Sequence, residues 1–162
     1  MHCRNTTLMP ECDVRACKSS EIFDDPGCAA LFAEYTEECA NALLGKPAPR
    51  REVYANLEAT GFAQCFAAYH GSTLRGFALV LATVVPHFGI RSATVESLFV
   101  SRVARHTGLG GRLMVEVERY ATWTHCDAIF YTAPVASELD LLLSVRPAAY
   151  RLTNHVYTKR LA

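Results

Sequence analysis

The sequence predicts an α+β fold in which a mixed sheet is flanked by helices. Three apolar stretches between residues 62 and 100 are joined by tight turns, which is typical of an antiparallel meander. A strand, a glycine-rich turn, an amphipathic helix and another strand then follow between residues 92 and 132. This order predicts a right-handed crossover between parallel strands. Apolar residues at helical spacing before residue 45 add helices at the start of the chain.

The first third of the chain is predicted to hold one strand and two helices. Residues 12–16 form a short strand-like stretch. Asp25-Pro26 is typical of a helix start, since Asp caps the first turn and Pro fits the first helical position. Apolar residues then recur at helical spacing as far as Gly45, which ends the helix. A second, shorter helix is predicted over residues 51–60.

The middle of the chain is predicted to be β. Strands are expected over residues 62–69, 74–85 and 92–100, because these stretches are rich in apolar and β-branched residues. A hairpin turn at residues 70–72 joins the first two strands, and a second turn at residues 86–89 reverses the chain again. The three strands are therefore expected to pair in sequence order.

The last third is predicted to alternate between helices and strands. Residues 109–124 place apolar and charged side chains on opposite faces of a helix. Residues 128–132 form a short apolar strand, and residues 135–145 a further helix that Pro147 follows. Residues 150–161 are expected to supply one or two closing strands.

Composition limits the classes of protein that fit. The 162 residues suit one domain over residues 1–162, and 51% of them are hydrophobic. Sixteen basic and sixteen acidic residues balance, which argues against a nucleic-acid-binding protein. No apolar run reaches the roughly 20 residues of a membrane span. The seven cysteines are odd in number and form no Cys-x-x-Cys pair, so we expect free thiols, no metal and a cytoplasmic protein.

The turn between residues 98 and 113 carries the clearest chemical signal. Gly108 and Gly110 allow a ligand to approach the backbone closely, and the turn leads directly into the 109–124 helix. The first N–H groups of a helix lack internal partners and lie at the positive end of its dipole. Arg102, Arg105 and Arg112 are expected to add positive charge. Together these features predict an anion site.

Two common phosphate-binding loops do not fit this turn. The sequence has no GxxxxGK run followed by Ser or Thr, as a P-loop requires. A dinucleotide fingerprint needs glycine at the sixth position, but the sixth residue counted from Gly108 is Leu113. The pattern that fits residues 105–110 is Arg-x-x-Gly-x-Gly.

This pattern resembles the signature of the GCN5-related N-acetyltransferase superfamily, Arg/Gln-x-x-Gly-x-Gly/Ala between a strand and a helix. The resemblance extends to the preceding strand, the following helix and strand, and the order of elements over residues 12–161. Residues 86–89, 96–100 and 150–157 also look like compact acetyltransferases of phage and prophage origin.

The resemblance implies an N-acetyltransferase that uses acetyl-CoA as cosubstrate. Main-chain groups of three residues on the strand would face the acetyl group and pantetheine arm: Leu98, Phe99 and Val100. Backbone amides of the turn would hold the pyrophosphate: Arg105, His106, Thr107, Gly108, Leu109, Gly110 and Gly111. The alternative is a plain turn that begins a helix.

Glu96 is the candidate catalytic base for deprotonating the acceptor amine. It shares strand parity with Leu98 and Val100, so its side chain is expected on the face that would contact the cofactor. The alternative is a carboxylate at the sheet rim, or one paired with a residue such as Arg91. His87, in the turn at residues 86–89, is a candidate contact for the acceptor, and a solvated turn histidine is the alternative.

No candidate for the general acid, which would protonate the departing thiolate, lies on the helix where the resemblance implies one. Members of the superfamily often use a Tyr on the helix after the fifth strand, but residues 139–145 contain none. Tyr131 and Tyr150 are the substitutes nearby, and core packing is the alternative for both. The departure leaves open a non-catalytic acyl-CoA-binding module that acts through a protein partner.

The resemblance implies a primary-amine acceptor, either a small molecule or a protein amine, attacked directly in a ternary complex. The acceptor pocket would lie between residues 40–51 and 152–157, which are neither strongly acidic nor strongly basic. The expected partners are thus acetyl-CoA and an amine, without nucleic acid or membrane, and a homodimer fits the superfamily.

Overall fold

The computed structural model describes residues 11–161 and contains a five-stranded sheet with strand order β1-β2-β3-β4-β5. Successive strands pair antiparallel as far as β4, and β5 pairs with β4 in parallel. The predicted meander and the parallel pairing of the last strand with β4 are therefore confirmed. The strands are β1 (Cys12–Cys17), β2 (Ala63–His70), β3 (Thr73–Val85), β4 (Ile90–Val100) and β5 (Ala128–Tyr131).

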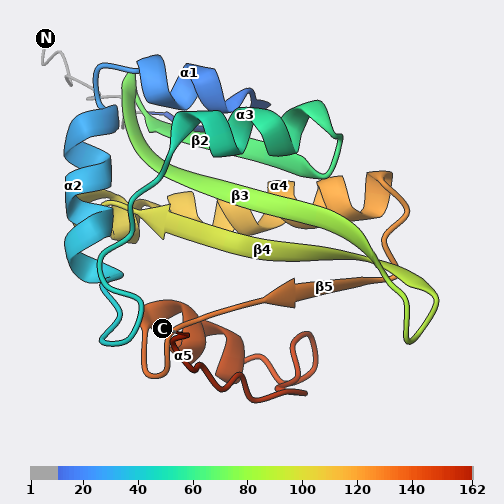
Figure 1. The fold of residues 1–162 in the computed structure, drawn as a ribbon. Helices are drawn as coiled ribbons and strands as arrows, with labels where there is room; N and C mark the ends of the chain where they lie inside the picture. The colour runs from blue at the N-terminus through green and yellow to red at the C-terminus, as the bar shows by residue number, and fades with distance from the viewer. Residues whose placement is uncertain (1–10, 162) are drawn as a thin grey trace, which may run out of the picture.

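Helices cover both faces of the sheet (Figure 1). One face carries three helices from the first part of the chain: α1 (Ser19–Asp24), α2 (Cys28–Glu38) and α3 (Arg51–Ala59). The other face carries α4 (Leu109–Trp123), which a short 3₁₀ helix, η1 (Arg102–Thr107), precedes. Beyond β5 the chain forms α5 (Glu138–Ser144).

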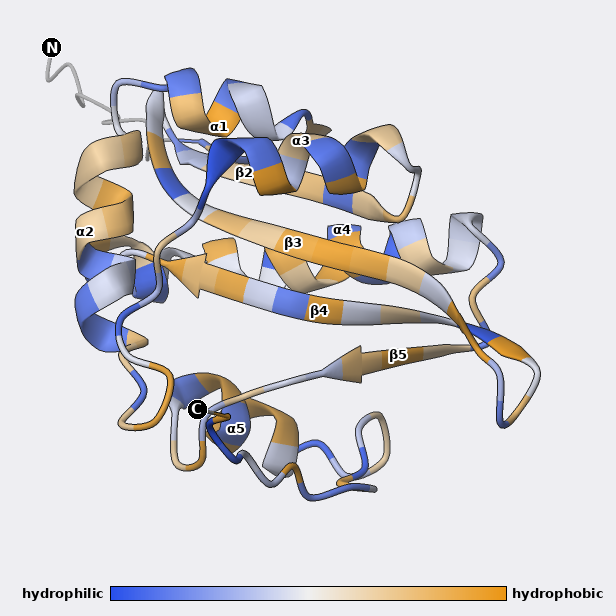
Figure 2. Cartoon of the chain, viewed as in Figure 1, coloured by the Kyte–Doolittle hydropathy of each residue, from blue (hydrophilic) through white to orange (hydrophobic). Residues whose placement is uncertain are grey.

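Burial of apolar side chains on both faces holds the layers together. On the α4 face, Val80 and Val95 of the sheet pack with Leu113 and Val117 of the helix in one buried cluster. On the opposite face, Phe77 belongs to a second cluster to which α1 and α2 contribute. Figure 2 shows the corresponding apolar band along β2 and β3. Each fully buried side chain of this kind stabilises the fold by about 1.5–3 kcal/mol.

A β-bulge in β4 determines which side chains share a face. Ser97 lies opposite Leu79, whereas Val95 lies opposite the next residue, Val80, so that Glu96 is an extra residue on β4. An extra residue reverses the alternation of faces beyond it. Leu98 consequently packs on the α4 face together with Val95.

β4 extends beyond its pairing with β5. The parallel ladder ends where Val95 lies opposite Tyr131, and the Thr132 hydroxyl donates a hydrogen bond to the Val95 carbonyl at 3.1 Å. After this point β5 leads toward α5 while β4 continues to Val100 (Figure 1). Residues 96–100 therefore have no strand partner on the β5 side within the described chain.

The first helices differ from the prediction. α1 was not expected, and α2 follows Gly27 as its N-cap instead of beginning at Pro26. α2 ends at Glu38 and does not continue to Gly45. The Asn41 side chain explains the early end, because its oxygen accepts the backbone N–H groups of Leu43 and Leu44 and so favours a turn over a helix.

The predicted closing strands are wrong. Residues 150–161 are irregular and almost entirely exposed, with Leu152 at 83% and Tyr157 at 92% relative exposure. α5 is also shorter than expected, because Ser137 caps it by accepting the Asp140 N–H at 3.2 Å. Alternating apolar residues therefore did not suffice to predict strands here.

The cysteines of the described residues are free thiols. Burial raises the pKa of the Cys17 thiol to about 12, and it also raises the pKa of Cys65, which lies directly opposite on β2. Both behave as small buried apolar residues. None of the helices that the structure describes has the length and hydropathy that a membrane crossing requires.

Candidate functional site

The glycine turn joins β4 to α4 through η1. Gly108 is the N-cap of α4 and has φ of +84°, a left-handed conformation that side-chain-bearing residues rarely adopt. Glycine at this position lets the chain leave η1 and begin α4 immediately. The local sequence thus fixes where the helix begins and where its first N–H groups lie.

Three backbone donors at the start of α4 are unpaired. The N–H groups of Leu109, Gly110 and Gly111 have no acceptor within residues 11–161, and Arg112 N–H is the first that bonds back, to the Gly108 carbonyl at 3.1 Å. No acidic residue lies in the first turn of α4. The donors and the positive end of the helix dipole favour an anion here.

The turn also has room for a ligand. A Cβ atom placed on Gly111 would meet nothing within 4 Å, and one on Gly110 would meet only the Val100 side chain at 3.8 Å. At the start of the turn the Ser101 hydroxyl is buried and has no partner within the described residues. Free backbone donors beside open space would suit the phosphate groups of a ligand.

The arginines near the turn have a different role from the predicted one. Arg105 pairs with Glu38 of α2, with Glu138 of α5 at 3.4 Å, and donates from Nε to the Val100 carbonyl at 3.1 Å. Arg102 Nε lies 3.0 Å from Glu38. These side chains link α2, β4 and α5, so their charge is largely neutralised.

The remaining residues of the turn are also placed by local contacts. Arg112 donates to the Cys12 carbonyl at 2.6 Å, which ties α4 to β1. Thr107 donates its hydroxyl to the Ala104 carbonyl at 2.7 Å, and His106 is exposed. Arg102 and Arg105 thus add less net charge to the turn than the sequence suggested, since both are paired with carboxylates, and an anion there would rely mainly on backbone donors.

The open edge of β4 continues from the turn toward the bulge. Leu98, Phe99 and Val100 pair with β3 on one side only. The pairing is close: a Cβ on Gly76 would lie 2.8 Å from the Phe99 carbonyl. Main-chain groups on the β5 side of this stretch are left for another partner, except for the Val100 carbonyl that Arg105 occupies.

A cavity of about 290 Å³ lies between α2, α3 and the bulge of β4. It is lined by Tyr35, residues 47–50, Val53, Tyr54 and Glu96. Glu96 is exposed, and its side chain lies on the α2–α3 side. This corrects the expectation that Glu96 shares a face with Leu98, which the bulge places on the α4 side.

Two tyrosines in this cavity were not singled out from the sequence. Burial raises the pKa of Tyr35 to about 12, and the Glu96 charge adds to the shift; burial raises the pKa of Tyr54 in the same way. Both hydroxyls are therefore protonated near neutral pH. No signal in the sequence joins these two residues to Glu96.

His87 does not reach this cavity. It lies in the turn between β3 and β4, at the opposite end of β4 from Val100 (Figure 1). Its side chain is exposed and its ring contacts the ring of Phe88 at a centroid distance of 4.9 Å. The structure therefore brings Glu96, but not His87, close to the open edge of β4.

Tyr131 and Tyr150 form a separate cluster. Both hydroxyls donate to Glu118 of α4, and their rings pack edge to face at 5.6 Å. Burial is the first cause that raises the pKa of Tyr131, and it raises that of Tyr150 to about 12. Neither lines the cavity with Glu96. Residues 152–157 do not line it either, whereas part of the predicted 40–51 segment does.

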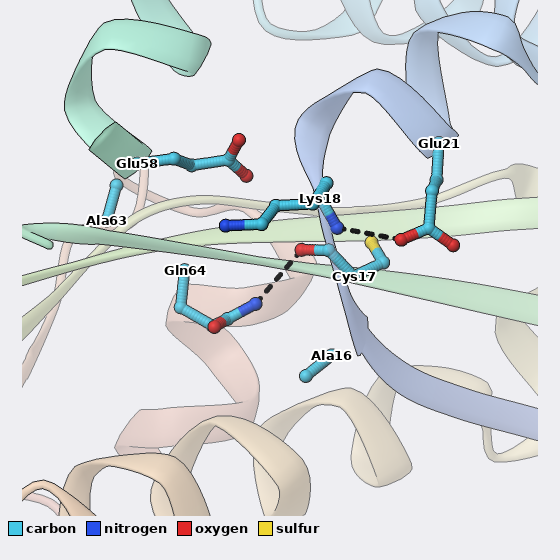
Figure 3. Close-up of a pocket in the computed structure, with 7 residues that line it drawn as sticks. All are labelled: Ala16, Cys17, Lys18, Glu21, Glu58, Ala63 and Gln64. Atoms are coloured by element: carbon cyan, nitrogen blue, oxygen red, sulfur yellow. Dashed lines mark hydrogen bonds between the residues drawn. The ribbon is translucent and has the colours of Figure 1, made fainter.

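A second cavity of about 280 Å³ lies beside β1, β2 and α3. Figure 3 shows the Lys18 side chain extending between Glu58 and Gln64. The polar groups around this second cavity largely pair with one another. Gln64 donates to the Cys17 carbonyl at 3.0 Å, and Glu58 accepts from the Ser19 hydroxyl at 2.9 Å. These contacts join β1, β2 and α3. No cluster of side chains that could hold a metal ion occurs within residues 11–161.

No protein-family model matches the sequence, and no curated protein matches it significantly. Solved structures match its fold along nearly the whole chain. A ribosomal-protein-alanine N-acetyltransferase from Brucella melitensis biovar Abortus 2308 superposes with a TM-score of 0.67 at 17% identity, covering 93% of this chain and 100% of that one. An aminoglycoside acetyltransferase from an uncultured soil metagenomic sample reaches 0.71 at 14% identity, covering 94% and 99%.

A protein described as a transcriptional regulator from Bacillus halodurans C-125 has a TM-score of 0.68 at 15% identity, covering 93% of this chain and 100% of that chain. At such low identity the similarity concerns the fold. The mixed sheet, the flanking helices and the glycine turn therefore identify this chain as having the fold of the GCN5-related N-acetyltransferases.

Proposed function

We propose that this protein is an N-acetyltransferase that moves the acetyl group of acetyl-CoA to a primary amine. The observation that carries the proposal is the row of unpaired N–H groups at residues 109–111, which lies at the end of a strand with an open edge. A CoA molecule carries an anionic diphosphate and an extended amide-containing arm. The turn fits the first, and the edge of β4 fits the second.

Acetyl-CoA would supply the acetyl group as a thioester. The amides of residues 105–111 would hold its pyrophosphate, and main-chain groups of Leu98, Phe99 and Val100 would align its arm. The Val100 carbonyl is less available for this role than the main-chain groups of Leu98 and Phe99, because it already accepts a hydrogen bond from Arg105. Positioning of this kind supplies much of the rate of a bimolecular reaction.

Glu96 is the proposed base. The bulge places it beside the open stretch of β4 and in the wall of the cavity, where an acceptor amine would enter. Within the described residues its carboxylate has neither a salt bridge nor a side-chain hydrogen bond, so it is free to take a proton from an ammonium group. The same side chain would attract the ammonium before that step.

The chain offers no strong acid for the departing thiol. Tyr35 has a pKa of about 12, and a thiol titrates near 8.5, so proton transfer from this tyrosine to a thiolate is unfavourable. Burial raises the pKa of Tyr54 as well. We therefore propose that the thiolate departs unprotonated and takes its proton from the buffer in bulk solvent, where a thiol with a pKa near 8.5 is largely protonated at neutral pH.

A non-catalytic acyl-CoA-binding module is the second candidate. It is favoured by the lack of a tyrosine in residues 139–145 and by the absence of a strong acid in the cavity. The solved structure described as a transcriptional regulator has a similar fold. A module of this kind would bind acetyl-CoA at the same turn and act through a protein partner.

Isothermal titration with acetyl-CoA, followed by a thiol-release assay over a panel of primary amines, separates the two candidates. The proposal predicts binding and amine-dependent release of CoA. Binding without turnover of any small or peptide amine would favour the module, and lack of binding would contradict both. A homodimer and a cytoplasmic location belong to the same proposal, and light scattering of the purified protein tests the dimer.

A further inference from the structure

The cavity beside the bulge contains one acidic and one basic side chain. Glu96 lines it from β4, and Arg50 lines it from the N-cap of α3. The remaining wall is formed largely by aromatic and aliphatic groups, including Tyr35, Tyr54 and Val53. Such a cavity is complementary to a ligand that carries one positive charge, one negative charge and an apolar group.

Both charges are available to a ligand. Arg50 has one ionic partner among the described residues, Glu52, at 3.9 Å, and both side chains are about 70% exposed in that pair. Such a surface pair contributes little, about 0–1 kcal/mol, so it competes weakly with a bound anion. Glu96 has no ionic partner within residues 11–161.

The size of the cavity limits the ligand further. A volume of about 290 Å³ lies just below the roughly 300–1,000 Å³ that is typical of small-molecule sites. A polycation would also need several carboxylates, whereas here Arg50 offsets Glu96. Both the volume and the charge balance favour a small molecule without excess positive charge.

We propose that the acceptor is a small zwitterionic amine, namely a free amino acid with an apolar side chain. Its ammonium lies against Glu96, its carboxylate against Arg50, and its side chain against the tyrosines and Val53. This assignment deepens the proposed function and rests on it. Arg50 is then a specificity-determining residue, because it alone in the wall distinguishes an amino acid from the corresponding amide or amine.

The test compares matched ligands on the CoA-saturated protein. L-Phenylalanine, L-leucine and L-methionine are each titrated against their primary amides and their decarboxylated amines by calorimetry, and the same compounds are used in the thiol-release assay. We expect the best free acid to bind at least about 10-fold more tightly than its amide, since a charge-assisted hydrogen bond is lost in the amide.

Two variants refine the comparison. Arg50→Gln should weaken binding of the acids by about 10- to 100-fold and leave the amides within about 2-fold. Lys46→Gln is the matched control, because it removes a positive charge from the same segment at an exposed position that does not line the cavity. It should change neither series.

The outcomes separate this inference from the proposed function. Amides or plain amines that bind and react as well as the acids would overturn the inference and leave the acetyltransferase intact. Acids that bind through Arg50 without any release of CoA would overturn both the acceptor role of the amino acid and the enzyme, and would favour the non-catalytic module. Absence of binding by every acid would overturn the inference as well.

Discussion

The glycine turn and the cavity at the bulge lie along the same strand, but they are built in different ways. The turn uses backbone donors of residues 109–111, and a single glycine at position 108 positions them. The cavity uses side chains from α2, α3, the segment between them and β4. A main-chain site depends on a short local pattern, whereas a side-chain site depends on how distant segments meet.

The two regions also differ in charge. Near the turn, Arg102 and Arg105 are paired with carboxylates of α2 and α5, so the backbone is left to bind an anion. In the cavity, Glu96 has no ionic partner among the described residues, and Arg50 pairs only with the exposed Glu52, at 3.9 Å. The turn is thus suited to an invariant group such as a diphosphate, and the cavity to selecting among acceptors.

Changes in the cavity should affect turnover more than cofactor binding. Glu96→Gln removes the proposed base, and we expect kcat to fall by about 10²–10⁴-fold. The affinity for acetyl-CoA should stay within about 2-fold, because Glu96 is not part of the turn. Thiol-release kinetics and calorimetry measure both quantities. Glu37→Gln, an exposed carboxylate of α2 outside the cavity, is the control; a fast Glu96→Gln enzyme would eliminate this residue as base.

A negative charge placed at the glycine turn should affect cofactor binding more than turnover. Gly111→Asp adds a carboxylate where the structure has open space, and an acid in the first helical turn stabilises a helix. We expect an unchanged or higher melting temperature, with a loss of about 10- to 100-fold in CoA affinity through repulsion of the diphosphate. Gly111→Asn is the neutral control. Equal CoA affinity in the Asp and Asn variants would contradict a diphosphate at this turn.

The arginine network should affect stability. Arg105 has 18% side-chain exposure and bridges three elements, so Arg105→Gln should lower the free energy of unfolding by about 1–3 kcal/mol. Arg102 is 61% exposed, and Arg102→Gln should cost about 0–1 kcal/mol. Chemical denaturation measures both. Similar values for the two variants would mean that the bridge to Val100 and α5 contributes nothing.

Alkaline pH gives the smallest predicted effect. Tyr35 titrates at 10.0 when unperturbed and at about 12 in the fold, chiefly because it is buried. Above the first value the unfolded chain loses this proton while the folded chain retains it, so stability is complete below pH 10 and declines toward pH 12. Tyr35→Phe should remove part of the decline, by about 1 kcal/mol near pH 11. Thermal melts at several pH values test this; identical declines would contradict it.

The sequence predicted the regular part of the fold well. The meander, the crossover and α4 follow from local periodicity and from glycine at turns, and the structure contains them within a few residues. The strands expected at residues 150–161 are absent from the structure, since alternation at Leu152 and Val156 specifies a strand only where a partner edge is available. The early end of α2 depended on one side chain, Asn41.

The candidate site was only partly predictable. The glycine turn could be found because its residues are adjacent in sequence. The pairing of Arg105 with Glu38 joins positions 67 residues apart, and no local pattern indicates it. The bulge at Glu96 has no sequence signal of its own, yet it decides which face each neighbouring side chain occupies. Tyr54 and Arg50 enter the site through the packing of α3.

The most direct test is a crystal structure of the protein soaked with CoA. We expect density for the diphosphate within hydrogen-bonding distance of the N–H groups of Leu109, Gly110 and Gly111, with the arm running along residues 98–100 of β4. Density for CoA in another cleft, or a vacant turn at saturating CoA, would contradict the proposed diphosphate site.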